Sequence, residues 1–188
     1  LNYPWHGLPK LVIYKSDDFT RRLNGVLSRP LAGVAFSANA VLQYLHAHCT
    51  VFLIGGVVRD VLHRLENNVK DIDIAFSNSS EHIGTLVANQ FPLSASTPFG
   101  RIQFGQGSGI FLEGKAFNGH NNDRDAKTQT HPKCMSVNLE ADLICRDFTC
   151  NVLWYDMMNH VIIDPTGEGL QDLHDKKLRI PVPQNQWD

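Results

Sequence analysis

The chain has 188 residues, of which 43% are hydrophobic and 19% are charged, and these fractions are typical of one folded globular domain with at most a modest appendage. It contains no uninterrupted apolar run long enough to cross a bilayer, which argues against a membrane-spanning protein. The formal net charge of −2 excludes a basic field over the whole surface, although a local basic groove for nucleic acid stays open.

The four cysteines have neither the spacing of a zinc site nor the density of a disulfide scaffold. We therefore expect free thiols in a reducing compartment. This predicts a cytoplasmic protein, with the mitochondrion as the alternative location.

Prolines and glycines interrupt the beginning of the chain, so we expect residues 1–33 to form an irregular N-terminal extension and residues 34–188 to form the main domain. Within the extension, residues 11–14 predict one short strand. Asp17–Leu27 predicts a short helix that begins at Ser16 or Asp17.

The rest of the chain alternates between helical and strand-like patterns of apolar residues. The expected helices are residues 35–48, 57–65, 79–91, 139–156 and 167–174. The expected strands are Val51–Ile54, Asp71–Phe76, Arg101–Phe104, 110–117 and Val161–Asp164, with a last extended piece at 178–180. The polar stretch 118–138 predicts a loop. We therefore predict an α+β fold: a small mixed or antiparallel sheet flanked by helices.

A glycine pair, Gly55 and Gly56, separates a buried strand from the next helix. Glycines at such a turn let the backbone approach a ligand, and the start of a helix offers unpaired N–H groups to an anion. Arg59 in the first helical turn can clamp a phosphate, and Asp60 can hold Arg59 in place. An ordinary tight turn with a surface Arg–Asp pair explains the same residues equally well.

The segment Asp71–Ile72–Asp73–Ile74 places two carboxylates on one face of a strand, roughly 6.5–7 Å apart along the chain. Such a pair repels itself unless a cation lies between the two groups. An oxygen-preferring divalent ion such as Mg²⁺ resolves the repulsion and also binds nucleotide phosphates. In isolation, however, an Asp-x-Asp pattern is more typical of a solvated edge strand.

A third group of polar residues is Arg146, Asp147 and Asn151. On the helix expected there, Asp147 and Asn151 share a face, so the three side chains can reach a common cleft. A plain surface helix is the alternative. The glycine-rich segment 164–173 is interpreted as a structural turn followed by a capped helix.

Taken in order, the motifs are G-G-x-V-R-D, then K-D-x-D, then R-D-F-T-x-N, then D-P-x-G-x-G-L-x-D-L with a later arginine. This series resembles the catalytic head of class II CCA-adding enzymes and bacterial poly(A) polymerases, in the polymerase-β-like nucleotidyltransferase superfamily. The resemblance extends from about Val51 to Arg179. It implies that residues 34–188 form a nucleotidyltransferase head domain.

The resemblance implies a Mg²⁺-dependent transfer of a nucleoside monophosphate from ATP or CTP to a hydroxyl, most simply the 3′ end of an RNA such as tRNA. Asp71 and Asp73 are then expected to bind Mg²⁺. Relatives carry a third carboxylate on a later strand, for which Glu113 is the nearest match. The expected nucleotide-binding residues are Gly55, Gly56, Arg59, Asp60, Arg146, Asp147 and Asn151.

The chain departs from the family pattern at two site positions: Cys145 replaces the first arginine of an arginine pair, and Asn118 replaces an arginine that follows the third carboxylate. In the family, helical regions after the head select the base and grip tRNA, so we expect RNA contacts to depend on domains that this chain lacks. Two alternatives stay open. One is a compact nucleotidyltransferase with a non-RNA acceptor, and the other is a degenerate head that binds nucleotide without turnover.

Overall fold

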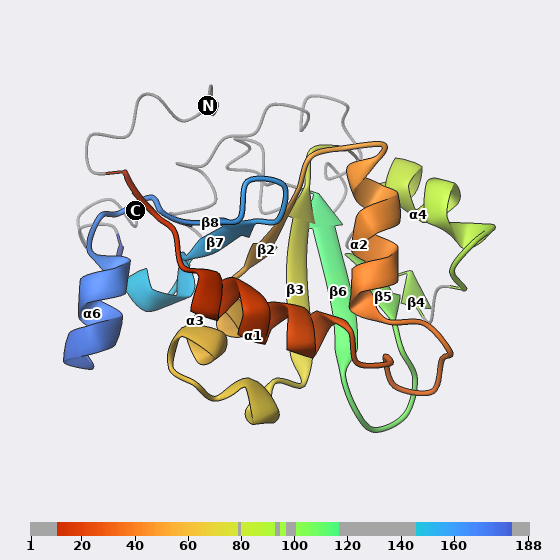
Figure 1. Ribbon diagram of the computed structural model, residues 1–188. Coiled ribbons are helices and arrows are strands. Elements are labelled where there is room, and N and C mark those ends of the chain that lie inside the picture. The colour runs from red at the N-terminus through yellow and green to blue at the C-terminus, as the bar shows by residue number, and fades with distance from the viewer. Residues whose placement is uncertain (1–10, 79, 93–94, 97–100, 117–145, 182–188) are drawn as a thin grey trace.

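A computed structural model of the protein describes residues 11–78, 80–92, 95–96, 101–116 and 146–181. Its strands are β1 (Val12–Tyr14), β2 (Val51–Ile54), β3 (Asp71–Phe76), β4 (Ala95–Ser96), β5 (Arg101–Phe104), β6 (Phe111–Ala116), β7 (Trp154–Asp156) and β8 (Val161–Asp164). They form one sheet in the order β1-β8-β7-β2-β3-β6-β5-β4 (Figure 1). Strands β3 and β6 run parallel and the other neighbours run antiparallel, which confirms the predicted α+β fold with a mixed sheet.

The helices are α1 (Asp17–Leu27), α2 (Ala38–His46), α3 (Gly56–Leu62), α4 (Ser80–Ala88) and α6 (Gly169–Asp175). Serine caps begin two of them, because the Ser16 hydroxyl accepts the Phe19 N–H at 3.2 Å and the Ser37 hydroxyl accepts the Ala40 N–H at 3.4 Å. These caps satisfy N–H groups that have no partner within the helix. Figure 1 shows α1 and α2 on the same side of the sheet, with α1 crossing in front of β3 and β6 and α2 next to β6.

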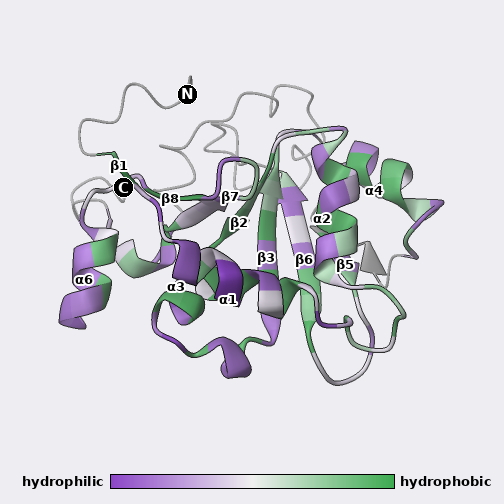
Figure 2. Ribbon diagram, viewed as in Figure 1, coloured by the Kyte–Doolittle hydropathy of each residue, from purple (hydrophilic) through white to green (hydrophobic). Residues whose placement is uncertain are grey.

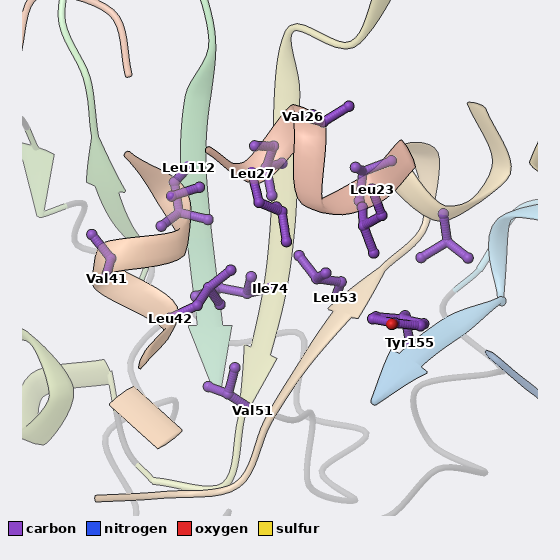
Figure 3. Packing of buried hydrophobic residues seen from close by; sticks show 14 of the residues in the cluster. Leu23, Val26, Leu27, Val41, Leu42, Val51, Leu53, Ile74, Leu112 and Tyr155 are labelled. Carbon is purple, nitrogen blue, oxygen red and sulfur yellow. The ribbon is translucent and has the colours of Figure 1, made fainter. Parts of the chain in front are cut away.

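The main core lies between these helices and one face of the sheet. Leu27 of α1 and Leu42 of α2 are fully buried, and in Figure 3 they lie close to Leu53 of β2 and Ile74 of β3. A second, smaller cluster on the opposite face is made by strand residues: Phe52, Ile54, Ala75, Trp154, Val161 and Ile163. Among the described residues, the sheet therefore has one face covered by helices and an opposite face with only this smaller apolar cluster.

Alternation along β3 and β6 places acidic residues on the face opposite the helices. Ile72 and Ile74 of β3 and Leu112 of β6 belong to the main core, so Asp73 and Glu113, next to them in sequence, point the other way. Figure 2 shows the same alternation as bands of contrasting hydropathy along β3.

At Gly114 of β6, the neighbouring side chains leave no room for a Cβ atom. A Cβ there would lie 2.8 Å from Phe76 Cε1, 2.9 Å from Ile74 Cγ1 and 3.1 Å from Ile102 Cγ1. We expect Gly114→Ala to destabilise the protein by about 1–3 kcal/mol, because these buried side chains must shift. Urea unfolding checks the prediction, and Gly25→Ala on α1, where a Cβ meets nothing within 4 Å, is the control that should cost no stability. Equal midpoints for wild type and Gly114→Ala would contradict this packing.

The described part of the N-terminal segment is ordered into regular elements. Strand β1 pairs with β8, and Phe19, Leu23, Val26 and Leu27 of α1 are buried in the main core. The strand and helix predicted within residues 11–27 are confirmed, including the cap at Ser16. The expectation of an irregular segment is therefore wrong for residues 11–27, whereas the division of domains at residue 33 stays a prediction.

The helix predicted for residues 139–156 is wrong in its described part. Residues Thr149–Asn151 form one short 3-10 turn, and β7 follows immediately. Phe148 has extended backbone angles, φ −134° and ψ 150°, and β7 is buried on both faces between β2 and β8. A strand buried on both faces loses its polar alternation, and its apolar run then imitates a helical period.

Smaller differences concern element ends. The helix after the glycine pair ends at Leu62 rather than residue 65, because Arg64 takes a positive φ of 60°. Residues 178–180 join no strand, although the Arg179 carbonyl accepts the Thr149 N–H at 2.8 Å. The loop predicted at 118–138 lies outside the described residues, as do Asn118, Cys134 and Cys145. None of the helices described in the structure is long and apolar enough to span a membrane.

Candidate active site

The turn between β2 and α3 brings three segments of the chain together. Gly55 has φ 69° and ψ −128°, a conformation that favours glycine, and its N–H donates to the Leu153 carbonyl at 3.1 Å. A Cβ at Gly55 would lie 3.7 Å from the Asn151 carbonyl oxygen, 3.8 Å from Arg146 Nη1 and 4.0 Å from Asp73 Oδ2. The glycine turn, the aspartate of β3 and the segment before β7 therefore meet at one point.

Two of the predicted carboxylates are neighbours on adjacent strands. Asp73 of β3 is in register with Glu113 of β6, and both line a pocket of about 220 Å³ together with Ile54, Lys115 and Arg146. Asp71 lies at the start of β3, where its side chain is exposed. The structure thus pairs Asp73 with Glu113 and leaves Asp71 exposed at the start of β3.

The surroundings of Asp73 disfavour the ionised form of its carboxyl group. Burial raises its pKa first, and the nearby Glu113 and Asp71 charges raise it further, against the lowering effects of Arg146 and Lys115. An ionised Asp73 is therefore costly until a cation joins the pair.

We expect Asp73→Asn to stabilise the protein against unfolding at neutral pH when no divalent cation is present. The raised pKa means that folded Asp73 holds its proton more tightly than the unfolded chain does, so the wild type loses stability as the pH rises through that pKa. Asparagine does not ionise and avoids this loss. Urea midpoints between about pH 4 and about pH 8 should separate as the pH rises. A difference that is constant with pH would contradict this electrostatic cause.

The predicted phosphate clamp, Arg59, is fixed by two partners. Its Nε and Nη2 atoms both lie 2.8 Å from Asp60 Oδ1, and its Nη1 donates to Asn151 Oδ1 at 2.6 Å. Asn151 in turn donates to Asp147 Oδ1 at 3.0 Å. Asp60 therefore holds Arg59, and Asp147 and Asn151 share one hydrogen-bonded chain with it, although Asn151 ends a 3-10 turn and Asp147 lies in the bend before that turn rather than on a helix.

Asp147 keeps its negative charge in this chain. Desolvation alone would raise its pKa, but hydrogen bonds from Asn151 and the Phe148 N–H outweigh it, so the pKa lies below the usual value. A fixed carboxylate that accepts from Asn151 sets the orientation of the amide, and the amide oxygen then faces Arg59.

A buried polar network contacts the segment that carries Asp147 and Asn151. Asp172 of α6 is 1% exposed, accepts the Thr149 hydroxyl at 2.7 Å and pairs with Arg179 Nε at 3.0 Å. The sequence pattern of residues 164–173 predicts a structural turn. The carboxylate of Asp164 organises this turn by accepting the Thr166, Gly167 and Leu170 N–H groups. The link between Asp172 and Thr149 was missed, because contacts between residues so far apart in sequence leave no local pattern.

The donor set of the pocket suits a hard divalent cation. In the part of the chain that the structure describes, no three His, Cys, Asp or Glu side chains are gathered closely enough to hold a metal ion. Mg²⁺, however, is usually bound by one or two carboxylates and completes its shell with substrate phosphates and water. The oxygen-only pair of Asp73 and Glu113, with the exposed Asp71 two positions before Asp73 on β3, fits that pattern.

The sheet order, the paired carboxylates and the strand–glycine–helix turn define a nucleotidyltransferase head fold. A family profile described as the Poly A polymerase head domain matches residues 51–179, which is more than half of the chain. The chain belongs to this family.

Curated relatives and solved structures agree with this assignment. Poly(A) polymerase I of Haemophilus influenzae is 28% identical over 199 residues, covering 96% of this chain and 43% of the relative. The CCA-adding enzyme of Lactobacillus helveticus is 29% identical over 150 residues, covering 79% and 36%. A tRNA nucleotidyltransferase solved with a primer tRNA and an incoming ATP analogue superposes with a TM-score of 0.56 at 25% identity, covering 76% and 39%. The chain thus spans less than half the length of these relatives.

Proposed function

We propose that this chain is the catalytic head of a Mg²⁺-dependent nucleotidyltransferase that transfers a nucleoside monophosphate from ATP or CTP to the 3′ hydroxyl of an RNA. The observation that carries the proposal is the Asp73–Glu113 pair beside the Gly55 turn and Arg146. The names of the relatives support the reaction class, since they are poly(A) polymerases and CCA-adding enzymes.

In this proposal Asp71 and Asp73 hold Mg²⁺, and Glu113 completes the acidic set on β6. The bound ion would neutralise the charge that develops on the attacking and leaving oxygens. The chain's own residues then have to position the α-phosphorus against the acceptor hydroxyl, because catalysis of this kind depends mainly on orientation and charge stabilisation.

The nucleotide-binding side of the site is assigned to the glycine turn and the residues linked to it. Gly55 and Gly56 let the triphosphate approach the backbone. The described contacts of Arg59 use three of its five N–H groups, so the others can reach a phosphate. Arg146 would contact the triphosphate near Asp73, and Asp147 and Asn151 would contact the ribose while they orient Arg59.

We propose that the reaction takes place in a reducing compartment, the cytoplasm, or the mitochondrion as the alternative. Among the described cysteines, Cys49 and Cys150 are free thiols, and burial raises their pKa values, that of Cys49 to about 11. Thiols held in the protonated form are poor nucleophiles, so no role in the reaction is assigned to them.

The experiment that tests the proposal follows a labelled nucleotide. The protein is incubated with labelled ATP or CTP, Mg²⁺ and a tRNA that lacks its 3′ end, and the label is then located. Label in RNA that depends on Asp71 and Asp73 supports the proposal. Label in protein or in a small molecule would replace RNA by another acceptor, and nucleotide binding without any incorporation would indicate a head without turnover.

A further inference from the structure

Lys115 is a basic residue of the carboxylate pocket to which none of the roles above is assigned. It lies on β6 two positions after Glu113, and therefore on the same face of the sheet. It is in register with Ala75, two positions after Asp73, and it lines the pocket with both acids.

The pocket has two basic residues in its described lining, and they stand on opposite sides of β3. Arg146 Nη1 lies 3.8 Å from the Cβ position of Gly55, at the end of β2. Lys115 projects from β6, and β3 lies between β2 and β6 in the sheet. Asp73 is thus flanked by one cation on the side of the glycine turn and by another on the side of β6.

In the reaction, the side of the glycine turn and the side of β6 have different roles. The attacking and leaving oxygens lie in line on opposite sides of the phosphorus during transfer. Gly55, Arg59 and Asn151 hold the triphosphate in the proposed function, so the pyrophosphate leaves toward α3. The acceptor hydroxyl must then approach from the side of β6, where Lys115 lies.

We propose that Lys115 binds a backbone phosphate of the RNA acceptor next to its 3′ hydroxyl. This inference rests on the proposed function and identifies the acceptor's chemistry as a polyanionic strand rather than an uncharged hydroxyl compound. A lysine ammonium is a compact point charge on a flexible stem, which suits a phosphodiester whose position shifts between substrates.

The test measures RNA binding without turnover, by fluorescence anisotropy of a labelled RNA oligonucleotide with the full chain. Lys115→Met should weaken binding about tenfold, as expected for loss of a charged hydrogen bond, and Lys115→Arg should restore most of it. The slope of log affinity against log salt should fall by about 0.7 for the lost phosphate contact. Lys15→Met, after β1 and away from the pocket, makes the same charge change and should leave binding unaltered.

A second acceptor locates the contact on the strand. An oligonucleotide with an uncharged methylphosphonate at its last linkage should bind the wild type as weakly as Lys115→Met binds normal RNA, and the two changes together should cause no further loss. The inference would be overturned if Lys115→Met bound RNA with wild-type affinity, or if the wild type showed no measurable RNA binding. It would also be overturned if Lys115→Met weakened binding equally for the normal and the methylphosphonate oligonucleotides. RNA binding that depends on Lys115 without any label incorporated would sustain it while the proposed turnover fails.

Discussion

Asp73→Asn should reduce nucleotide transfer by at least about a thousandfold while the fold stays intact. The substitution removes one of the two adjacent negative charges of the pocket, and with it the charge that would hold a divalent cation against the α-phosphate. Initial rates of label incorporation, measured at saturating nucleotide, report this loss. We expect Asp71→Asn to abolish turnover as well.

The stability of the same variant makes the prediction specific. Because Asp73→Asn is expected to unfold at a higher urea concentration than the metal-free wild type, loss of activity cannot be attributed to loss of fold. Asp17→Asn on the exposed first turn of α1 is the matched control, and it should transfer nucleotide at the wild-type rate. Retained turnover in both Asp71→Asn and Asp73→Asn would rule out these residues as the metal site.

Arg59→Met should raise the KM for the nucleotide by about 10- to 100-fold, with a smaller effect on the KM for the acceptor. Asp60, on the same helix, and Asn151 hold the guanidinium in place before a nucleotide binds. Binding therefore loses little of the conformational entropy of this side chain. Removing it loses a charge-assisted contact to phosphate and leaves Asn151 without this donor. Steady-state kinetics with nucleotide and acceptor varied separately measure the two constants.

Two further variants separate charge from geometry. Arg59→Lys keeps the charge but loses the planar fork, and it should recover only part of the nucleotide affinity. Arg64→Met, a 72% exposed arginine that pairs with Asp18 on the surface, removes one positive charge nearby and should leave the KM unchanged. If Arg64→Met and Arg59→Met were equally impaired, a general field effect rather than a specific clamp would be responsible.

The parts of the site that could be predicted are those with strong local patterns. The run Val51–Ile54 followed by Gly55 has few alternatives to a buried strand and a sharp turn, and the first four residues of Asp71–Phe76 alternate between acidic and apolar side chains. Ser16, a residue type that is favoured at helix N-caps, predicted where α1 begins. In these cases local chemistry and tertiary packing agree.

The parts that could not be predicted depend on tertiary contacts. Phe148 and Val152 are four apart and imitate a helix, but neighbouring strands bury Trp154–Asp156 on both faces and draw it into the sheet. Lys115 resembles any solvated lysine on an alternating strand until the register sets it opposite Ala75, in the pocket that Asp73 and Glu113 also line. Spacing in sequence cannot show which strands become neighbours, and the register decides both outcomes.

The most direct measurement of the central claim is the mass of an RNA oligonucleotide after incubation with the full chain, Mg²⁺ and ATP or CTP. The account predicts a product heavier by one or more nucleoside monophosphate residues. It also predicts that the product is absent with Asp73→Asn and with an oligonucleotide whose terminal 3′ hydroxyl is replaced by hydrogen. An unchanged RNA mass with the wild type, or an increase that persists with the 3′-deoxy oligonucleotide, would contradict it.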